Sequence, residues 1–214
     1  MYGVIIKEAK GNFIPYVYER LPDTDKPQLK QWFTQAGSGL LTSNEFLTLL
    51  GFDDPEYHMK NYVENYLTMD GGFYTFADEF CGKYDFALLS NDVSAWSEYI
   101  CEHYGLNGYL SHKIVSADVG LRKPDPAIYT LALERISADP ADCVFVDNKA
   151  ENVRVAEHLG IKGVIFGNEE SDSNLLRARD FAVSDLLEKI PLADEVVVHA
   201  VNLALTRFAG SGRY

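Results

Sequence analysis

Three short apolar runs after about residue 72 each lead to a polar side chain. Ser90 ends the first run, Lys123 follows the second, and Asp147 ends the third. Ligands of open α/β sheets bind beyond the carboxyl ends of the strands, so we expect these side chains to converge at one edge of a sheet. Together, a hydroxyl, an ammonium and a carboxylate can bind a phosphate group and a metal ion.

Each of these groups also has a plainer interpretation. Ser90 and Asn91 could offer a hydroxyl and backbone N–H groups to an anion at a helix start, or the same polar segment could simply cap that helix. Lys123 precedes Pro124, which favours extended backbone and a fixed position, but it could equally be a surface lysine. Asp147 could bind Mg²⁺, which prefers few carboxylates plus waters and phosphate oxygens, or it could cap the next helix.

The order of elements in the second part of the chain predicts an α/β fold. The pattern gives helices at 73–83, 92–104, 126–136 and 150–159 and strands at 85–90, 113–116, 142–147 and 163–166. Such alternation is typical of βαβ units in a doubly wound, Rossmann-like parallel sheet. Residues 194–208 have a long apolar face, which predicts a terminal helix that packs on the core or on a partner subunit.

The first part of the chain has a different pattern. From about residue 13 to residue 69, apolar and aromatic residues recur at helical spacing and strand signals are scarce. Helix boundaries are predicted at Thr42, Gly51 and Pro55. We therefore expect a small helical domain at 13–70, with residues 1–12 and 71–214 forming the α/β domain.

The amino-acid composition limits the kinds of molecule that the protein is expected to bind. The chain has 214 residues, 47% of them hydrophobic, and a formal net charge of −13. That charge argues against nucleic acid or an anionic membrane as the main partner, because both are bound by neutralising phosphates with Lys and Arg. The three cysteines lie far apart without ligand spacing, and neither a membrane span nor a signal peptide is recognisable, so a cytoplasmic protein is expected.

Taken together, the three strand ends resemble the haloacid dehalogenase-like hydrolase superfamily, in particular its phosphatase-type members with a helical cap. The matching motifs are Leu89-Ser-Asn91, Gly120-Leu-Arg-Lys-Pro-Asp-Pro126 and Phe145-Val-Asp-Asn148. Their order and spacing agree with the family from about residue 72 to residue 166. The helical 13–70 segment lies where the family inserts its cap.

The resemblance implies hydrolysis of a small phosphate ester through an aspartyl-phosphate, with Mg²⁺ as cofactor. Ser90 and Asn91 would bind the phosphate, Lys123 would neutralise nucleophile and phosphate together, and Asp147 would hold the metal. The implied metal site comprises Asp147, Asn148 and Tyr2. In the segment that resembles the cap, Trp32, Phe33 and the Gly37-Ser-Gly39 loop are candidates for facing the substrate, although Trp32 could equally belong to the core of the helical domain.

The family's first motif is incomplete in this sequence. Met1-Tyr-Gly-Val4 matches only the tail of that motif, whose nucleophilic Asp would directly precede Met1. We therefore expect the first core strand to be missing and buried backbone groups beside it to be unpaired. We also expect Met1 to be an internal methionine and the chain as given to be inactive or nearly so.

Two other functions remain open from the sequence. Haloacid dehalogenases carry Tyr at the position of Tyr2 and need no metal, whereas phosphatases of the family usually have there an Asp that acts as general acid and base. Asp147 argues against a dehalogenase, because an unpaired carboxylate would repel an acid substrate. The other alternative is an inactive protein that uses the fold and cap for binding. The sequence does not decide between a monomer and a homodimer.

Overall fold

The structure is a computed structural model that describes residues 1–10, 12–166 and 203–207, the last of these as backbone only. Its helices are α1 (Phe13–Tyr18), α2 (Lys26–Ala36), α3 (Ser43–Leu50), α4 (Pro55–Tyr66), α5 (Gly71–Phe80), α6 (Ser94–His103), α7 (Ser116–Val119), α8 (Pro126–Ile136) and α9 (Ala150–His158). Its strands are β1 (Ile6–Glu8), β2 (Leu67–Met69), β3 (Tyr84–Ser90), β4 (Leu110–Val115), β5 (Val144–Asp147), β6 (Lys162–Ile165) and β7 (Leu203–Arg207). Every described helix is too short or too polar to cross a membrane.

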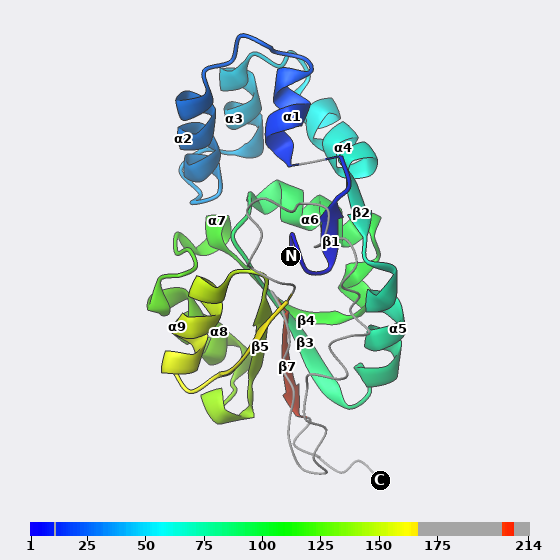
Figure 1. The fold of residues 1–214 in the computed structure, drawn as a ribbon, viewed down its shortest axis with the longest axis vertical. Helices are drawn as coiled ribbons and strands as arrows, with labels where there is room; N and C mark the ends of the chain where they lie inside the picture. Colours follow the sequence, from blue (N-terminus) through cyan, green and yellow to red (C-terminus); the bar gives the residue numbers. More distant parts are fainter. Residues whose placement is uncertain (11, 167–202, 208–214) are drawn as a thin grey trace.

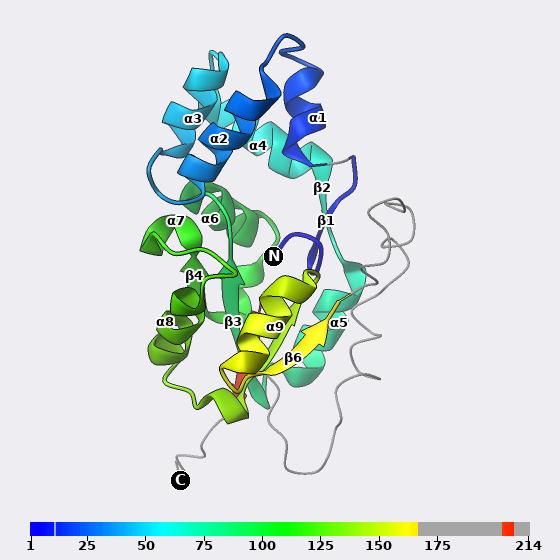
Figure 2. The ribbon, with the colours of Figure 1, turned by 60° about the vertical axis from the view of Figure 1, so that its left-hand side comes forward.

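The main sheet has five strands in the order β4-β3-β7-β5-β6. β3 pairs in parallel with β4, and β5 pairs in parallel with β6, as expected for βαβ units. Both faces of the sheet are covered: α5 is on one side and α8 and α9 are on the other (Figures 1 and 2). The fold is therefore the expected α/β class, with the predicted strands and connecting helices confirmed.

β7 is the main departure from the sequence prediction. Residues 203–207 form a strand and not the end of a helix, and they pair antiparallel with both β3 and β5. The rest of the predicted 194–208 helix lies outside the described residues. Without β7, the facing edges of β3 and β5 would both have unpaired backbone groups. Pairing with these groups outweighs the helical periodicity of the segment.

The same strand corrects the expectation of unpaired backbone in the middle of the sheet. β7 pairs along β3 from Tyr84 to Leu88 and also reaches Val144 and Phe145 of β5. The position between β3 and β5 is thus filled by a segment from late in the sequence, running opposite to its neighbours.

Helices α1–α4, which we call the helical layer, lie at one end of the sheet (Figure 1). A short antiparallel ribbon of β1 and β2 connects this layer to the rest of the molecule. Thr42 begins α3 with a complete capping box, and Gly51 ends it in the left-handed conformation with φ 100°. Pro55 is the first residue of α4, so all three predicted helix boundaries are confirmed.

The helical layer and the α/β part share one hydrophobic core. Trp96 of α6 is fully buried and contacts the ring of Phe13 in α1 at 4.8 Å between centroids. Its Nε1 donates to the buried Ser43 hydroxyl at the start of α3, at 2.7 Å. Because one tryptophan packs against both parts, the helical layer is held onto the sheet domain by apolar burial and by a satisfied buried donor.

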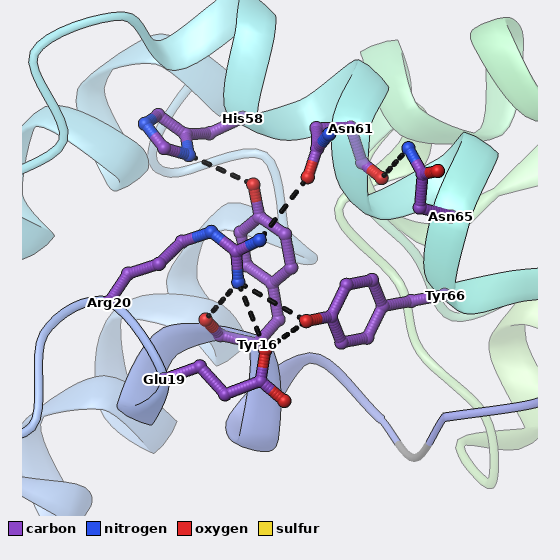
Figure 3. A network of polar contacts seen from close by, with 7 residues as sticks. All are labelled: Tyr16, Glu19, Arg20, His58, Asn61, Asn65 and Tyr66. Atoms are coloured by element: carbon purple, nitrogen blue, oxygen red, sulfur yellow. Dashed lines mark hydrogen bonds and ion pairs between the residues drawn. The ribbon is translucent and has the colours of Figure 1, made fainter.

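A polar network ties α1 to α4 within this layer (Figure 3). The Arg20 guanidinium lies over the Tyr16 ring, 3.8 Å from its centroid, and donates to the Tyr16 carbonyl at 3.1 Å. It also donates to the Tyr66 hydroxyl at 3.3 Å and to Asn61 Oδ1 at 3.4 Å. The arginine thus fixes where α1 ends relative to α4.

Candidate functional site

Lys123 and Asp147 form a buried ion pair near the ends of β3 and β5. The Lys123 ammonium lies 2.8 Å from an Asp147 carboxylate oxygen and donates a second hydrogen bond to the Leu89 carbonyl at 2.7 Å. Lys123 is only 6% exposed, so the interpretation as a surface lysine is wrong. Burial lowers the pKa of Lys123, although Asp147 opposes this. Burial acts to raise the pKa of Asp147, but the Lys123 charge and the hydrogen bonds outweigh it and hold that pKa below its usual value.

Asn91 holds the backbone of Lys123 in place. The Asn91 amide group donates to the Lys123 carbonyl at 2.8 Å, and its oxygen accepts from the Lys123 N–H at 2.8 Å. This reciprocal pair joins the segment after β3 to the lysine segment and aims the Lys123 side chain at Asp147. The sequence suggested Asn91 as a phosphate ligand and did not predict this positioning contact.

Ser90 is the last residue of β3 and is buried, in register with Val115 of β4. The following helix, α6, has Val93 as its N-cap and no side-chain cap bond. Neither Ser90 nor Asn91 therefore caps α6. Phosphate binding by Ser90 stays a prediction.

The first residues of the chain form a tight turn against Asn148. Gly3 has φ +76°, and a Cβ added there would lie 2.4 Å from the Asn148 amide nitrogen. The positive φ favours glycine here, and a Cβ would fit only if the Asn148 side chain moved. The turn places Gly3 against the Asn148 side chain, while the Tyr2 hydroxyl donates to Asp92; a metal site shared by Tyr2, Asp147 and Asn148 stays a prediction.

The oxygen donors of this region suit a hard cation such as Mg²⁺. One Asp147 oxygen accepts from Lys123 and the other from the Lys149 N–H at 2.8 Å, and each oxygen keeps a further lone pair. The other predicted ligands, Asn148 and Tyr2, would add an amide oxygen and a backbone carbonyl. Among the described residues, no group of three or more His, Cys, Asp or Glu could hold a metal by itself. The donor set therefore fits Mg²⁺, which binds through one or two carboxylates and takes the rest of its ligands from water and phosphate.

Asp92 is a buried carboxyl group that sequence reasoning did not assign to the site. It accepts hydrogen bonds from the Val93 N–H at 2.8 Å, the Ser97 hydroxyl at 2.7 Å and the Tyr2 hydroxyl at 3.5 Å. Burial raises the pKa of Asp92 to about 6, although these hydrogen bonds oppose the shift. Burial, with Asp92 alongside, also raises the pKa of Tyr2 well above its usual value. The one sequence signal was an acidic residue at a helix start, which is common in caps.

A cavity of about 210 Å³ lies between the helical layer and this site. Tyr2 and Asn91 line it from the site, and Phe33 of α2 lines it from the helical layer. Trp32 is not among its lining residues and instead packs, half-buried, against the main core. Of the two aromatic candidates on α2, Phe33 thus faces the cavity, and substrate binding by Trp32 stays a prediction.

The loop after α2 is pressed against the α/β part. Gly39 has φ +77°, and a Cβ added there would lie 2.2 Å from the Ala117 carbonyl oxygen. The Ser116 hydroxyl donates to the Gly37 carbonyl at 2.5 Å and accepts from the Asp92 N–H at 3.0 Å. Gly37 and Gly39 therefore allow the helical layer to contact Ser116 and Ala117 closely, and Ser116 in turn contacts Asp92 after β3.

A model of the haloacid dehalogenase-like (HAD) hydrolase family matches residues 30–160. The chain belongs to this family and has its Rossmann-like α/β fold.

Among curated proteins, flavin mononucleotide hydrolase 1 of Arabidopsis thaliana is 36% identical over 76 residues, which are 36% of this chain and 31% of that protein. (S)-2-Haloacid dehalogenase 2 of a Pseudomonas species is 26% identical over 110 residues, 51% of this chain and 48% of that protein. The matched segments thus span less than half of either relative.

A solved HAD family enzyme of Bacteroides thetaiotaomicron, in complex with magnesium and inorganic phosphate, matches 83% of this chain and 96% of its own. The TM-score is 0.67 at 21% identity, a likeness that supports the shared fold.

Proposed function

We propose that this site hydrolyses small phosphate monoesters. The observation that carries the proposal is the buried pair of Lys123 and Asp147, 2.8 Å apart at the ends of the parallel strands. A buried ammonium fixed by a carboxylate and a carbonyl is a positive charge in a water-poor place, where it stabilises a phosphoryl group strongly. The phosphatase-like relative and the family membership support the same reaction class.

The chain's own residues would bind and neutralise the phosphoryl group. Lys123 would contact a phosphate oxygen, while Asn91 keeps the lysine backbone from moving. Ser90, at the end of β3, would donate its hydroxyl to a second phosphate oxygen. The helical layer, acting as the family's cap, would exclude water and enclose the rest of the substrate.

A magnesium ion held by Asp147, Asn148 and the Tyr2 carbonyl would supply charge neutralisation to the phosphate. The nucleophile would be an aspartate directly before Met1, next to the turn that contacts Asn148. Its carboxylate would form a bond to phosphorus as the ester oxygen leaves, and water would then release inorganic phosphate from the aspartyl-phosphate.

The test compares the 214-residue chain with a version extended by an apolar strand that ends in Asp, and this strand would have to replace β7 between β3 and β5. Each is assayed for phosphate release from a panel of phosphate monoesters, with Mg²⁺ and with a chelator. We expect release only from the extended version and only with Mg²⁺. Equal turnover by both versions would show that the nucleophile lies elsewhere, and no release by either would remove the phosphatase proposal.

A second candidate is hydrolysis of 2-haloacids, because Tyr2 occupies the place of the usual phosphatase acid and a haloacid dehalogenase is among the relatives. The same two versions are therefore assayed for halide release from 2-haloacids. Halide release that persists in chelator, without phosphate release, would favour the dehalogenase over the phosphatase.

A further inference from the structure

The cavity between the helical layer and the site is lined mainly by aromatic side chains. These are Tyr2, Phe13, Phe33, Tyr62 and Trp96. Phe13, Tyr62 and Trp96 are each at most 5% exposed, so the core holds this side of the cavity in place, whereas Tyr2 and Phe33 are half-buried and present more of their rings to it. Flat apolar walls of this kind favour a flat apolar ligand, which can stack on ring faces or meet ring edges.

The aromatic walls also fix one another. Phe13 contacts Phe33 at 6.1 Å between centroids with nearly parallel rings, and it meets Trp96 at 4.8 Å edge to face. Tyr62 contacts Trp96 at 5.6 Å. Because each ring is held by another, the cavity cannot widen without loss of these contacts.

The volume of the cavity fits one ring. An apolar protein cavity of roughly 150 Å³ binds benzene, so a cavity of about 210 Å³ admits a single substituted ring. The polar groups on the walls, Lys30, Glu8 and Asn12, can contact substituents of such a ring.

The side chains beside the site are already engaged in hydrogen bonds. Tyr2 donates its hydroxyl to Asp92 at 3.5 Å, so its proton is already used. Asp92 already accepts three hydrogen bonds and is not part of the cavity wall. Glu8, the carboxylate of the wall, accepts from the Tyr62 hydroxyl at 3.5 Å. A phenol has a pKa of about 10 and can leave as its anion without a proton, which an alkyl alcohol cannot readily do.

We propose that the cavity binds the aromatic ring of an aryl phosphate monoester, whose phenolic oxygen leaves directly as the phosphoryl group is transferred. The inference rests on the proposed phosphatase function, and it adds the class of leaving group. The bond from phosphorus to the phenolic oxygen breaks as the bond from the aspartate nucleophile forms. The phenolate then takes its proton from solvent.

Binding to the 214-residue chain tests the cavity without any need for catalysis. The probes are phenylphosphonate, which carries the ring and is not hydrolysed, and methylphosphonate, which lacks it. Trp32→Phe leaves Trp96, on the cavity wall, as the one tryptophan, so its fluorescence reports binding. We expect phenylphosphonate to bind about tenfold to a hundredfold tighter than methylphosphonate, from burial of one ring. Equal affinity for the two phosphonates would overturn the proposal.

A matched pair of variants shows whether the ring enters this cavity. Ile14→Phe adds bulk at a half-buried residue of the wall, whereas Leu21→Phe makes a comparable change at a half-buried residue that does not line the cavity. Loss of the preference for phenylphosphonate in Ile14→Phe alone supports the assignment. Retention of the preference in Ile14→Phe, or its loss in both variants, places the ring elsewhere. Thermal unfolding of each variant confirms that it is folded before binding is measured.

Turnover by the version extended with Asp separates ring recognition from leaving-group chemistry. Phenyl phosphate and benzyl phosphate both carry the ring, but only phenyl phosphate releases a phenol. We expect phenyl phosphate to react fastest, benzyl phosphate slowly, and ethyl phosphate slowest. Fast release from ethyl phosphate would overturn the inference and leave the phosphatase function standing. Selective phenylphosphonate binding without any phosphate release would overturn the phosphatase function and leave the ring site standing.

Discussion

Gly39 is the residue at which the contact between the helical layer and the sheet domain can be tested most directly. Its φ of +77° is strained for any residue with a Cβ, and a Cβ there would lie 2.2 Å from the Ala117 carbonyl oxygen. Gly51, at the end of α3, has φ +100° but no atom within 4 Å of an added Cβ. Gly39→Ala and Gly51→Ala therefore share the backbone strain, and only the first adds a clash with backbone.

The expected loss of unfolding free energy is the sum of the backbone strain and the clash with Ala117. The left-handed conformation costs alanine about 1–2 kcal/mol, which is the whole effect expected for Gly51→Ala. The added clash at Gly39 involves a carbonyl oxygen that cannot rotate away, so the loop must move off Ala117, at a further cost of about 1–3 kcal/mol. We expect Gly39→Ala to lose about 2–5 kcal/mol of unfolding free energy, consistently more than Gly51→Ala.

Urea unfolding followed by circular dichroism gives the free energies, and hydrogen exchange locates the change. Exchange should increase at residues 37–41 and 116–120 in Gly39→Ala and stay unchanged there in Gly51→Ala. If the two variants lose the same free energy, the close contact of the loop with the sheet domain is absent in solution and the reasoning is refuted.

Three further predictions concern buried polar groups and a helix start. Lys123→Ala should cost about 3–5 kcal/mol of stability, because it leaves the Asp147 carboxylate buried without its partner. The double variant with Asp147→Ala should be less destabilised in urea unfolding than the sum of the single variants. Folding raises the pKa of Asp92 from 3.8 to about 6, so the folded protein holds a proton that the unfolded chain has lost. The free energy of unfolding should therefore fall by about 2 kcal/mol as pH rises from 4 to 6. Asp92→Asn should remove that slope, and an unchanged slope would assign it to other groups. Thr42→Ala should cost about 1 kcal/mol, because it breaks the capping box of α3. A loss near zero would mean that the cap is not formed in solution.

The parts of the site that follow from local sequence were predictable. Ser90 and Asp147 end strands whose apolar runs are long enough to recognise, and Pro124 marks the segment that holds Lys123. The boundaries of α3 and α4 follow from Thr42 and Pro55, because capping chemistry involves residues a few positions apart.

The parts that depend on distant residues were not predictable. The Asn91 amide pairs with the backbone of Lys123, and the Asp92 carboxyl is buried by packing from other elements. Neither contact leaves a periodic signal, because both require the fold before they exist. β7 was missed for the same reason: the apolar pattern of 203–207 fits a helix face, and only the open position between β3 and β5 makes a strand more stable there.

β7 also affects the order in which the molecule can fold. Phe86 pairs with Leu205, so the middle of the sheet depends on a contact between residues very far apart in sequence. Contacts of this kind form slowly, since a long loop must close before any pairing free energy is gained. During synthesis, β3 with β4 and β5 with β6 can each pair while the last strand is still missing. The two halves of the sheet therefore join only when residues 203–207 have left the ribosome, and until then the inner sides of β3 and β5 are open to pairing with other chains.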